Sequence, residues 1–132
     1  MKNVKLLWIE DDANFGPSIH YRIEDELQQN NIILDEPEIL QNGNYVWDTV
    51  RDLKPDIIMM DHNLQDVRVN GANLIIEIRF QNNETPIIFY SSEMGPTLMN
   101  LVNGEHKVFT TTRADVHSEL MRLVISEFAT EK

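Results

Sequence analysis

The chain has 132 residues, of which 22 are acidic and 11 basic, giving a formal charge of −11, and 42% of its residues are hydrophobic. A chain of this length can bury enough apolar surface for one core, so we expect a single domain over residues 1–132, without an output domain. The acidic excess argues against binding nucleic acid, which requires clustered lysine and arginine. Because the sequence has no cysteine, disulfides, thiolate metal sites and thiol nucleophiles are excluded.

The start of the chain holds only four consecutive apolar residues, Leu6 to Ile9, before three acids. This run is too short for the hydrophobic region of a signal peptide or for a membrane span. Together with the lack of cysteine, it predicts a cytoplasmic protein without membrane insertion. Its partners are expected to be other proteins, or small ions that bind carboxylates.

Short apolar runs rich in β-branched residues alternate with stretches of helical periodicity, which is typical of βαβ units and a parallel sheet. Five strands are expected, at Val4–Ile9, Glu36–Leu40, Asp56–Met60, Pro86–Tyr90 and Lys107–Thr110. The second strand contains Pro37, which cannot donate a hydrogen bond to a neighbouring strand, so this strand is predicted at an edge of the sheet.

The stretches between these runs repeat apolar residues with the spacing of amphipathic helices. Helices are expected around residues 15–27, 46–53, 71–82, 96–102 and 116–128. On the last helix, Met121 and Ile125 lie one turn apart and off the apolar stripe, so they are expected to be exposed. Exposed apolar residues at helical spacing can mark a surface for a protein partner.

Polar residues follow directly after the apolar runs. Glu10, Asp11 and Asp12 follow the first strand, Asp61 the third and Ser91 the fourth. The carboxyl ends of parallel strands meet at one edge of a sheet, where ligand sites lie. Two carboxylates about 4 Å apart repel by roughly 4 kcal/mol at an effective dielectric constant of about 20, and a hard divalent cation such as Mg²⁺ would offset this. Asp61 could then attack phosphorus as a nucleophile and form an aspartyl phosphate.

Three segments in this order resemble the receiver domain of the two-component response regulators. They are Leu6–Asp12, Lys54–Asp61 with a later Leu64 and Gly71, and Thr85–Ser92. The resemblance covers essentially the whole chain. It implies an α/β fold of three layers, (βα)₅ and flavodoxin-like, with a parallel five-stranded sheet in the strand order 2-1-3-4-5.

The resemblance also implies roles for individual residues. Glu10, Asp11 and Asp61 match the acids that bind Mg²⁺, and Asn63 matches the position whose backbone carbonyl is a further ligand. Asp61 matches the phosphoacceptor, and Ser91 matches the hydroxyl residue that hydrogen-bonds the phosphoryl group.

The end of the fifth strand departs from the family. The usual lysine and proline fall on Thr111 and Thr112, so the lysine that would pair with a phosphoryl oxygen is missing. Thr111 is a candidate contact to the phosphoryl group. It is equally well explained as an ordinary β-branched residue of the strand. Arg113 is expected to be a poor substitute for the lysine, because of strand alternation and its bulkier planar head.

Two further departures affect the coupling of the site to the rest of the domain. Val108 stands where the family often has an aromatic residue that changes rotamer. Gln65 replaces a proline, and Gly71 comes two residues late, so the loop after Asp61 is longer.

The leading prediction is a receiver domain of a phosphorelay. A sensor histidine kinase or phosphotransfer protein would phosphorylate Asp61 in a Mg²⁺-dependent reaction. The domain would then signal to a downstream protein through its fourth helix, fifth strand and fifth helix. Its chemistry would be at most self-phosphorylation and autodephosphorylation.

The alternative is a phosphorylation-independent pseudo-receiver that acts as a protein-interaction adaptor. A metal-dependent phosphatase is disfavoured, because Asn63 has no proton to supply as a general acid.

Overall fold

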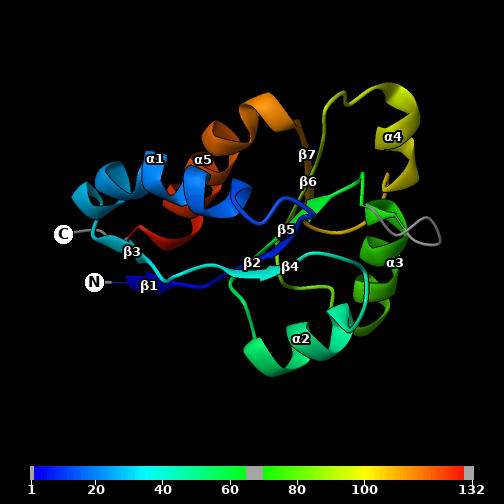
Figure 1. Ribbon diagram of the computed structural model, residues 1–132, viewed down its shortest axis with the longest axis horizontal. Helices are drawn as coiled ribbons and strands as arrows, with labels where there is room; N and C mark the ends of the chain where they lie inside the picture. The colour runs from blue at the N-terminus through cyan, green and yellow to red at the C-terminus, as the bar shows by residue number, and fades with distance from the viewer. Residues whose placement is uncertain (1, 65–69, 130–132) are drawn as a thin grey trace.

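The computed structural model describes residues 2–64 and 70–129 of the chain. A five-stranded parallel sheet forms its centre (Figure 1). From one edge to the other, its strands are β4 (Glu38–Leu40), β2 (Leu6–Ile9), β5 (Ile57–Asp61), β6 (Ile87–Ser91) and β7 (Val108–Thr112). Counted along the chain, this is the order 2-1-3-4-5, which confirms the predicted fold class. The strand next to Pro37 lies at the edge, as predicted.

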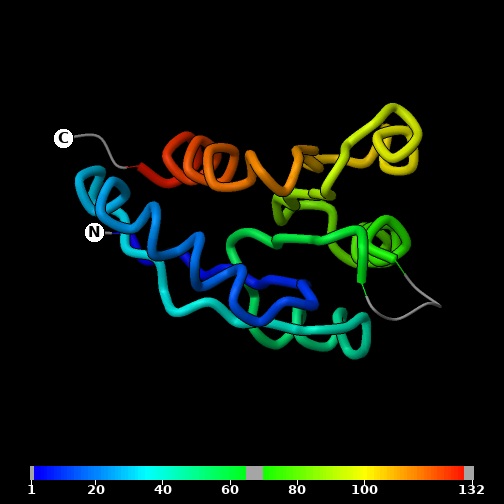
Figure 2. Tube along the Cα trace, turned by 45° about the horizontal axis from the view of Figure 1, so that its top comes forward, coloured from blue at the N-terminus to red at the C-terminus, as the bar shows by residue number. Residues whose placement is uncertain are grey.

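Helices cover both faces of the sheet (Figures 1 and 2). On one face α1 (Phe15–Gln29) and α5 (Val116–Phe128) lie side by side, with the short η1 (Arg113–Asp115) leading into α5. On the other face lie α2 (Val46–Leu53) and α3 (Gly71–Gln81), while α4 (Pro96–Leu101) follows β6. Alternate strand residues therefore enter two separate apolar clusters, one under each helical layer.

The first predicted strand is divided in two, and the second is shorter than predicted. β1 (Lys2–Val4) pairs with β3 (Ile32–Leu34) as a separate two-stranded parallel sheet, and β3 was not predicted. The division of the first strand falls at Lys5, whose N–H donates to the Asp56 carboxylate at 2.8 Å instead of to a strand. The second begins only at Glu38, after Pro37, which has no N–H to donate.

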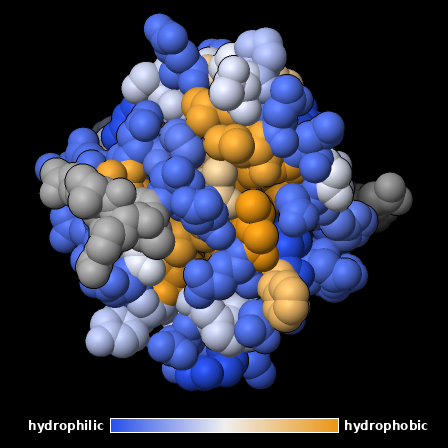
Figure 3. Space-filling view, turned by 90° about the vertical axis from the view of Figure 1, so that its right-hand side faces the viewer, coloured by the Kyte–Doolittle hydropathy of each residue, from blue (hydrophilic) through white to orange (hydrophobic). Residues whose placement is uncertain are grey.

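The prediction that Met121 and Ile125 are exposed is wrong, since both are half-buried and pack against the core under α1 and α5. The large exposed apolar side chains of α3 and α4 are Ile76, Phe80, Met99 and Leu101. Apolar side chains gather in a band on the side of the molecule that carries these two helices (Figure 3). No helix within the described ranges is both long and apolar enough to cross a membrane.

Candidate functional site

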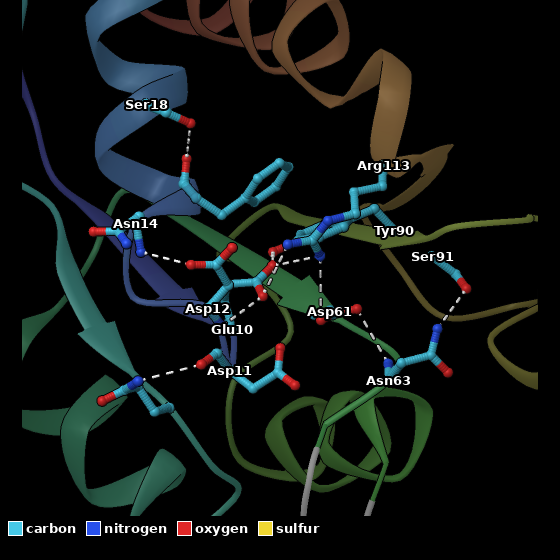
Figure 4. A network of polar contacts seen from close by, with 12 residues as sticks. Glu10, Asp11, Asp12, Asn14, Ser18, Asp61, Asn63, Tyr90, Ser91 and Arg113 are labelled. Carbon is cyan, nitrogen blue, oxygen red and sulfur yellow. Dashed lines mark hydrogen bonds and ion pairs between the residues drawn. The ribbon is translucent and has the colours of Figure 1, made fainter.

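Three carboxylates meet at the carboxyl edge of the sheet (Figure 4). Glu10 and Asp11 follow β2, and Asp61 is the last residue of β5. One carboxylate oxygen from each lies within 4.8 Å of the others. The backbone fixes this placement, since the Glu10 N–H donates to the Leu40 carbonyl at 2.9 Å and thereby extends the β2–β4 pairing. Glu10 and Asp61 are buried, and Asp11 is half-buried.

Glu10 accepts hydrogen bonds from four donors. Its Oε1 accepts from the Tyr90 hydroxyl at 2.7 Å and from Arg113 Nη1 at 2.8 Å. Its Oε2 accepts from the Asp12 backbone N–H at 2.9 Å and from Arg113 Nη2 at 3.2 Å. An ionised carboxylate offers about four acceptor positions, so Glu10 is saturated in this arrangement.

Arg113 supplies the positive charge of the site. Besides its two bonds to Glu10, its Nη1 lies 3.5 Å from Oδ2 of Asp61. The guanidinium carbon is 3.9 Å from the centre of the Phe15 ring and 5.9 Å from that of Tyr90. A planar cation stacked on an aromatic ring and paired with a carboxylate through two bonds is held in a fixed orientation.

A short polar network joins Asp61 to the end of β6. Oδ1 of Asp61 accepts the Asn63 backbone N–H at 3.1 Å. The side-chain amide of Asn63 donates to the Ser91 hydroxyl at 3.1 Å, as Figure 4 shows. Asp61, Asn63 and Ser91 therefore lie together, as the sequence predicts.

The acids of the site differ in their pKa values. Burial opposes ionisation of Glu10, but its hydrogen bonds from Arg113, Asp12 and Tyr90 outweigh burial and lower its pKa. Burial and then the charge of Glu10 raise the pKa of Asp61 to about 7, against an ordinary value of 3.8. Burial and the neighbouring Glu10 also raise the pKa of Asp11. The difference follows from the donors, because Glu10 receives the close contacts of Arg113.

The segment after Asp61 returns to the site at Gly71. The Gly71 N–H donates to the His62 carbonyl at 3.2 Å. A Cβ atom at position 71 would collide with the Asp61 carbonyl oxygen and come within 2.8 Å of the His62 Cα. Only glycine therefore lets α3 begin so close to the phosphoacceptor candidate.

The cation that reaches the acids is not at position 111. Thr111 lies in β7 opposite Tyr90 of β6, and its proposed contact to phosphate stays a prediction. The expectation that Arg113 substitutes poorly is corrected in one respect: β7 ends at Thr112 and Arg113 lies in η1, so strand alternation does not direct its side chain. Val108 is half-buried against the core, and Gln65 lies outside the described residues.

Sequence reasoning missed Tyr90 and Phe15 as parts of the site. Tyr90 ends an apolar run that is predicted as a strand, and Phe15 begins a predicted amphipathic helix, so the sequence alone indicates packing for both. A buried tyrosine near the carboxyl end of a strand needs a hydrogen-bond partner for its hydroxyl. Since Glu10 is predicted at the same edge of the sheet, its carboxylate could have been identified as that partner. The position of Phe15 under the guanidinium has no such signal in the sequence.

The three carboxylates have the ligand type of a hard-cation site, and their spacing could hold a metal ion. The full set does not fit a metal as it stands, however. All four acceptor positions of Glu10 are taken, two of them by Arg113, so Glu10 has no lone pair to offer while Arg113 stays.

Comparison of the sequence with protein-family models and with curated proteins finds no match. Several solved structures are similar over nearly the whole chain. The receiver domain of a Francisella response regulator has 20% identity and a TM-score of 0.69, with 92% of this chain and 93% of that chain covered. The response regulator domain of Thermotoga maritima CheB has 18% identity, a TM-score of 0.68 and coverages of 99% and 100%. The Vibrio cholerae chemotaxis protein CheY4 has 18% identity, a TM-score of 0.63 and coverages of 90% and 97%. The chain thus has the fold of the response regulator receiver domains.

Proposed function

We propose that this chain is a receiver module in which Asp61 accepts a phosphoryl group and the modified domain changes its affinity for another protein. The observation that carries the proposal is the surroundings of the Asp61 carboxylate. It lies at the carboxyl end of the central strand, beside two other acids, with the donors Asn63 and Arg113 in contact and Ser91 next to them. Receiver domains share this fold.

The proposed transfer is a single displacement at phosphorus. An oxygen of the Asp61 carboxylate bonds to phosphorus while the phosphorus–nitrogen bond of a phosphohistidine breaks, and the histidine nitrogen keeps the electron pair. The donor would be a sensor histidine kinase or a phosphotransfer protein in the cytoplasm. Arg113 and the Ser91 hydroxyl would donate hydrogen bonds to the phosphoryl oxygens, which carry the negative charge.

The resemblance implies Mg²⁺ held by Glu10, Asp11, Asp61 and the Asn63 backbone carbonyl. While Arg113 pairs with Glu10, only Asp11, Asp61 and Asn63 have an oxygen to offer to the ion. Bound there, the ion would neutralise charge on the incoming phosphoryl group. Glu10 would join this set only if Arg113 left it.

A second candidate function is a phosphorylation-independent adaptor that keeps the fold and uses its surface to bind a partner. The saturation of Glu10 and the presence of Thr111 in place of the lysine favour it. In either case the docking surface proposed from the sequence comprises the fourth helix, fifth strand and fifth helix. The exposed Met99 and Leu101 of α4 belong to that surface.

Phosphoryl acceptance is tested by incubating the protein with Mg²⁺ and acetyl phosphate and measuring the intact mass. We expect one added phosphoryl group in the wild type and in Asp25→Asn, a control carboxylate exposed on α1. Asp61→Asn should show none, because an amide oxygen is too weak a nucleophile. Absence of labelling in the folded wild type would leave the adaptor role, and labelling that persists in Asp61→Asn would place the acceptor elsewhere.

A further inference from the structure

The acid cluster already contains a cation. We infer that Arg113 occupies the cation position between Glu10 and Asp61 in this cluster, so that a divalent metal ion binds Glu10 only by displacing the Arg113 guanidinium. Which cation pairs with these carboxylates does not depend on whether Asp61 accepts a phosphoryl group.

Glu10 has no free acceptor position. Its carboxylate is fully buried and cannot turn to present a free oxygen to solvent. Of its donors, the Tyr90 hydroxyl belongs to a buried strand side chain and the Asp12 N–H to the backbone. Removing either group from Glu10 requires movement of the buried Tyr90 ring or of the backbone after β2. A metal ion therefore gains an oxygen of Glu10 only at the expense of Arg113.

Among the donors to Glu10, Arg113 is the one able to leave. Its side chain is 30% exposed, whereas that of Glu10 is fully buried. It comes from η1, outside the sheet, so its guanidinium can swing towards solvent while β6 and β7 stay paired. The exchange requires a change of side-chain rotamers and no unpairing of strands.

Arg113 is a strong competitor of a metal ion for Glu10. Its guanidinium is pre-oriented by the Phe15 ring, 3.9 Å away, and it makes two hydrogen bonds to one carboxylate. A metal ion must shed part of its hydration shell to replace those bonds, and Mg²⁺ does so reluctantly. Three carboxylates nevertheless exceed the single charge of Arg113. The outcome is competition between two cations and not complete exclusion of the metal.

The test is a titration of the metal-free protein with Mg²⁺, followed by calorimetry at constant ionic strength. The variants are Arg113→Met, which keeps an apolar side chain against Phe15, and Arg113→Lys. The control is Arg122→Met, which removes the same charge from an exposed arginine that pairs with Glu119 on α5. We expect Arg113→Met to bind Mg²⁺ about tenfold or more tightly than the wild type and the control, as for two ligands that exclude each other.

Arg113→Lys keeps the positive charge, so the affinity for Mg²⁺ can still be compared with the wild type if Arg113→Met fails to fold. A lysine can neither pair through two bonds nor stack as a plane, so its affinity for Mg²⁺ should lie between those of the wild type and Arg113→Met. As an independent measurement, the guanidinium nitrogen resonances of Arg113 in the wild type should shift as Mg²⁺ saturates, while those of Arg122 stay.

Equal affinities of the two Arg113 variants and the wild type would overturn the inference. So would metal saturation of the wild type that leaves the Arg113 resonances unchanged, or no binding by a folded Arg113→Met protein. Failure of Asp61 to accept phosphate would not alter any of these titrations, so it would overturn the proposed function alone.

Discussion

The neighbouring carboxyl groups of Glu10 and Asp61 differ in pKa. Glu10 and Asp61 are both buried, but Glu10 receives the Tyr90 hydroxyl and two nitrogens of Arg113 within 3.2 Å. Asp61 has the backbone N–H of Asn63 and a more distant Arg113 nitrogen at 3.5 Å. The close donors lower the pKa of Glu10, while burial raises that of Asp61 to about 7. At neutral pH Glu10 is thus the fixed charge and Asp61 the group that exchanges its proton.

Asp61→Asn should stabilise the metal-free protein at alkaline pH. The pKa of Asp61 is about 7 in the folded protein against 3.8 ordinarily, so between these values the folded state binds more protons than the unfolded state. The free energy of unfolding of the wild type therefore falls as pH rises through this window. The neutral asparagine lacks this fall, so at about pH 8 the variant should be more stable by about 2–4 kcal/mol. The gain should shrink towards about pH 4.

Urea unfolding in the presence of a chelator, repeated across this pH range, measures the difference. Asp25→Asn, on the exposed face of α1, is the matched control and should follow the wild type. A constant difference between Asp61→Asn and the wild type at every pH would show that Asp61 keeps its charge down to its ordinary pKa.

The acids of the site could be predicted from the sequence, but the arginine that joins them could not. Glu10, Asp11 and Asp61 each follow an apolar run, and the parallel sheet alone brings such ends together. The direction of Arg113 depends on where β7 ends and η1 begins, and an error of one residue in that boundary would place Arg113 in the strand, on a face set by alternation. Its contact with Phe15 depends further on how α1 packs against α5.

At the scale of elements, periodicity located the helices and the five main strands, because each buries one stripe or both faces. It failed for β3 (Ile32–Leu34), since three apolar residues so soon after the end of α1 at Gln29 are too few to be distinguished by periodicity from a last helical turn. It also failed on the exposure of Met121 and Ile125. Those side chains lie off the main apolar stripe of α5, yet they still pack against the core under α1 and α5. A helical wheel drawn for one helix does not include the neighbouring helix, so it does not show this contact.

The contact between β5 and α3 provides a test of how the site is framed. Gly71→Ala would push a methyl group into the Asp61 carbonyl and the His62 Cα. We expect a loss of about 1–3 kcal/mol in the free energy of unfolding, as for other substitutions that overpack a well-filled site. Because the collision involves backbone next to Asp61, phosphoryl labelling should also slow.

Gly95→Ala is the matched control for this substitution. Gly95 directly precedes α4, has a negative φ, and a Cβ there would meet no atom within 4 Å. Its stability, measured by urea unfolding, should stay within about 0.5 kcal/mol of the wild type. If both alanine variants behaved alike, the close approach of α3 to β5 would not limit the fold.

The whole molecule carries an acidic excess that the site shares. With 22 acidic and 11 basic side chains, carboxylates repel one another across the surface as well as in the cluster. Exposed ion pairs such as Arg51 with Asp48 and Arg122 with Glu119 offset little of this, because each is worth less than about 1 kcal/mol in water. Folding brings like charges closer than they are in the extended chain, so the balance is unfavourable at low salt.

Salt should therefore stabilise the protein. Raising NaCl from about 0.02 M to about 0.3 M shortens the screening length from roughly 20 Å to roughly 6 Å, which removes most long-range repulsion. We expect the free energy of unfolding, measured with urea, to rise by about 1 kcal/mol. A fall in the free energy of unfolding instead would mean that attractive pairs dominate the surface.

The same series of unfolding measurements separates general screening from binding at the site. Mg²⁺ bound by the acid cluster must stabilise the protein more than NaCl of equal ionic strength does. This extra stabilisation must be larger in Arg113→Met than in the wild type.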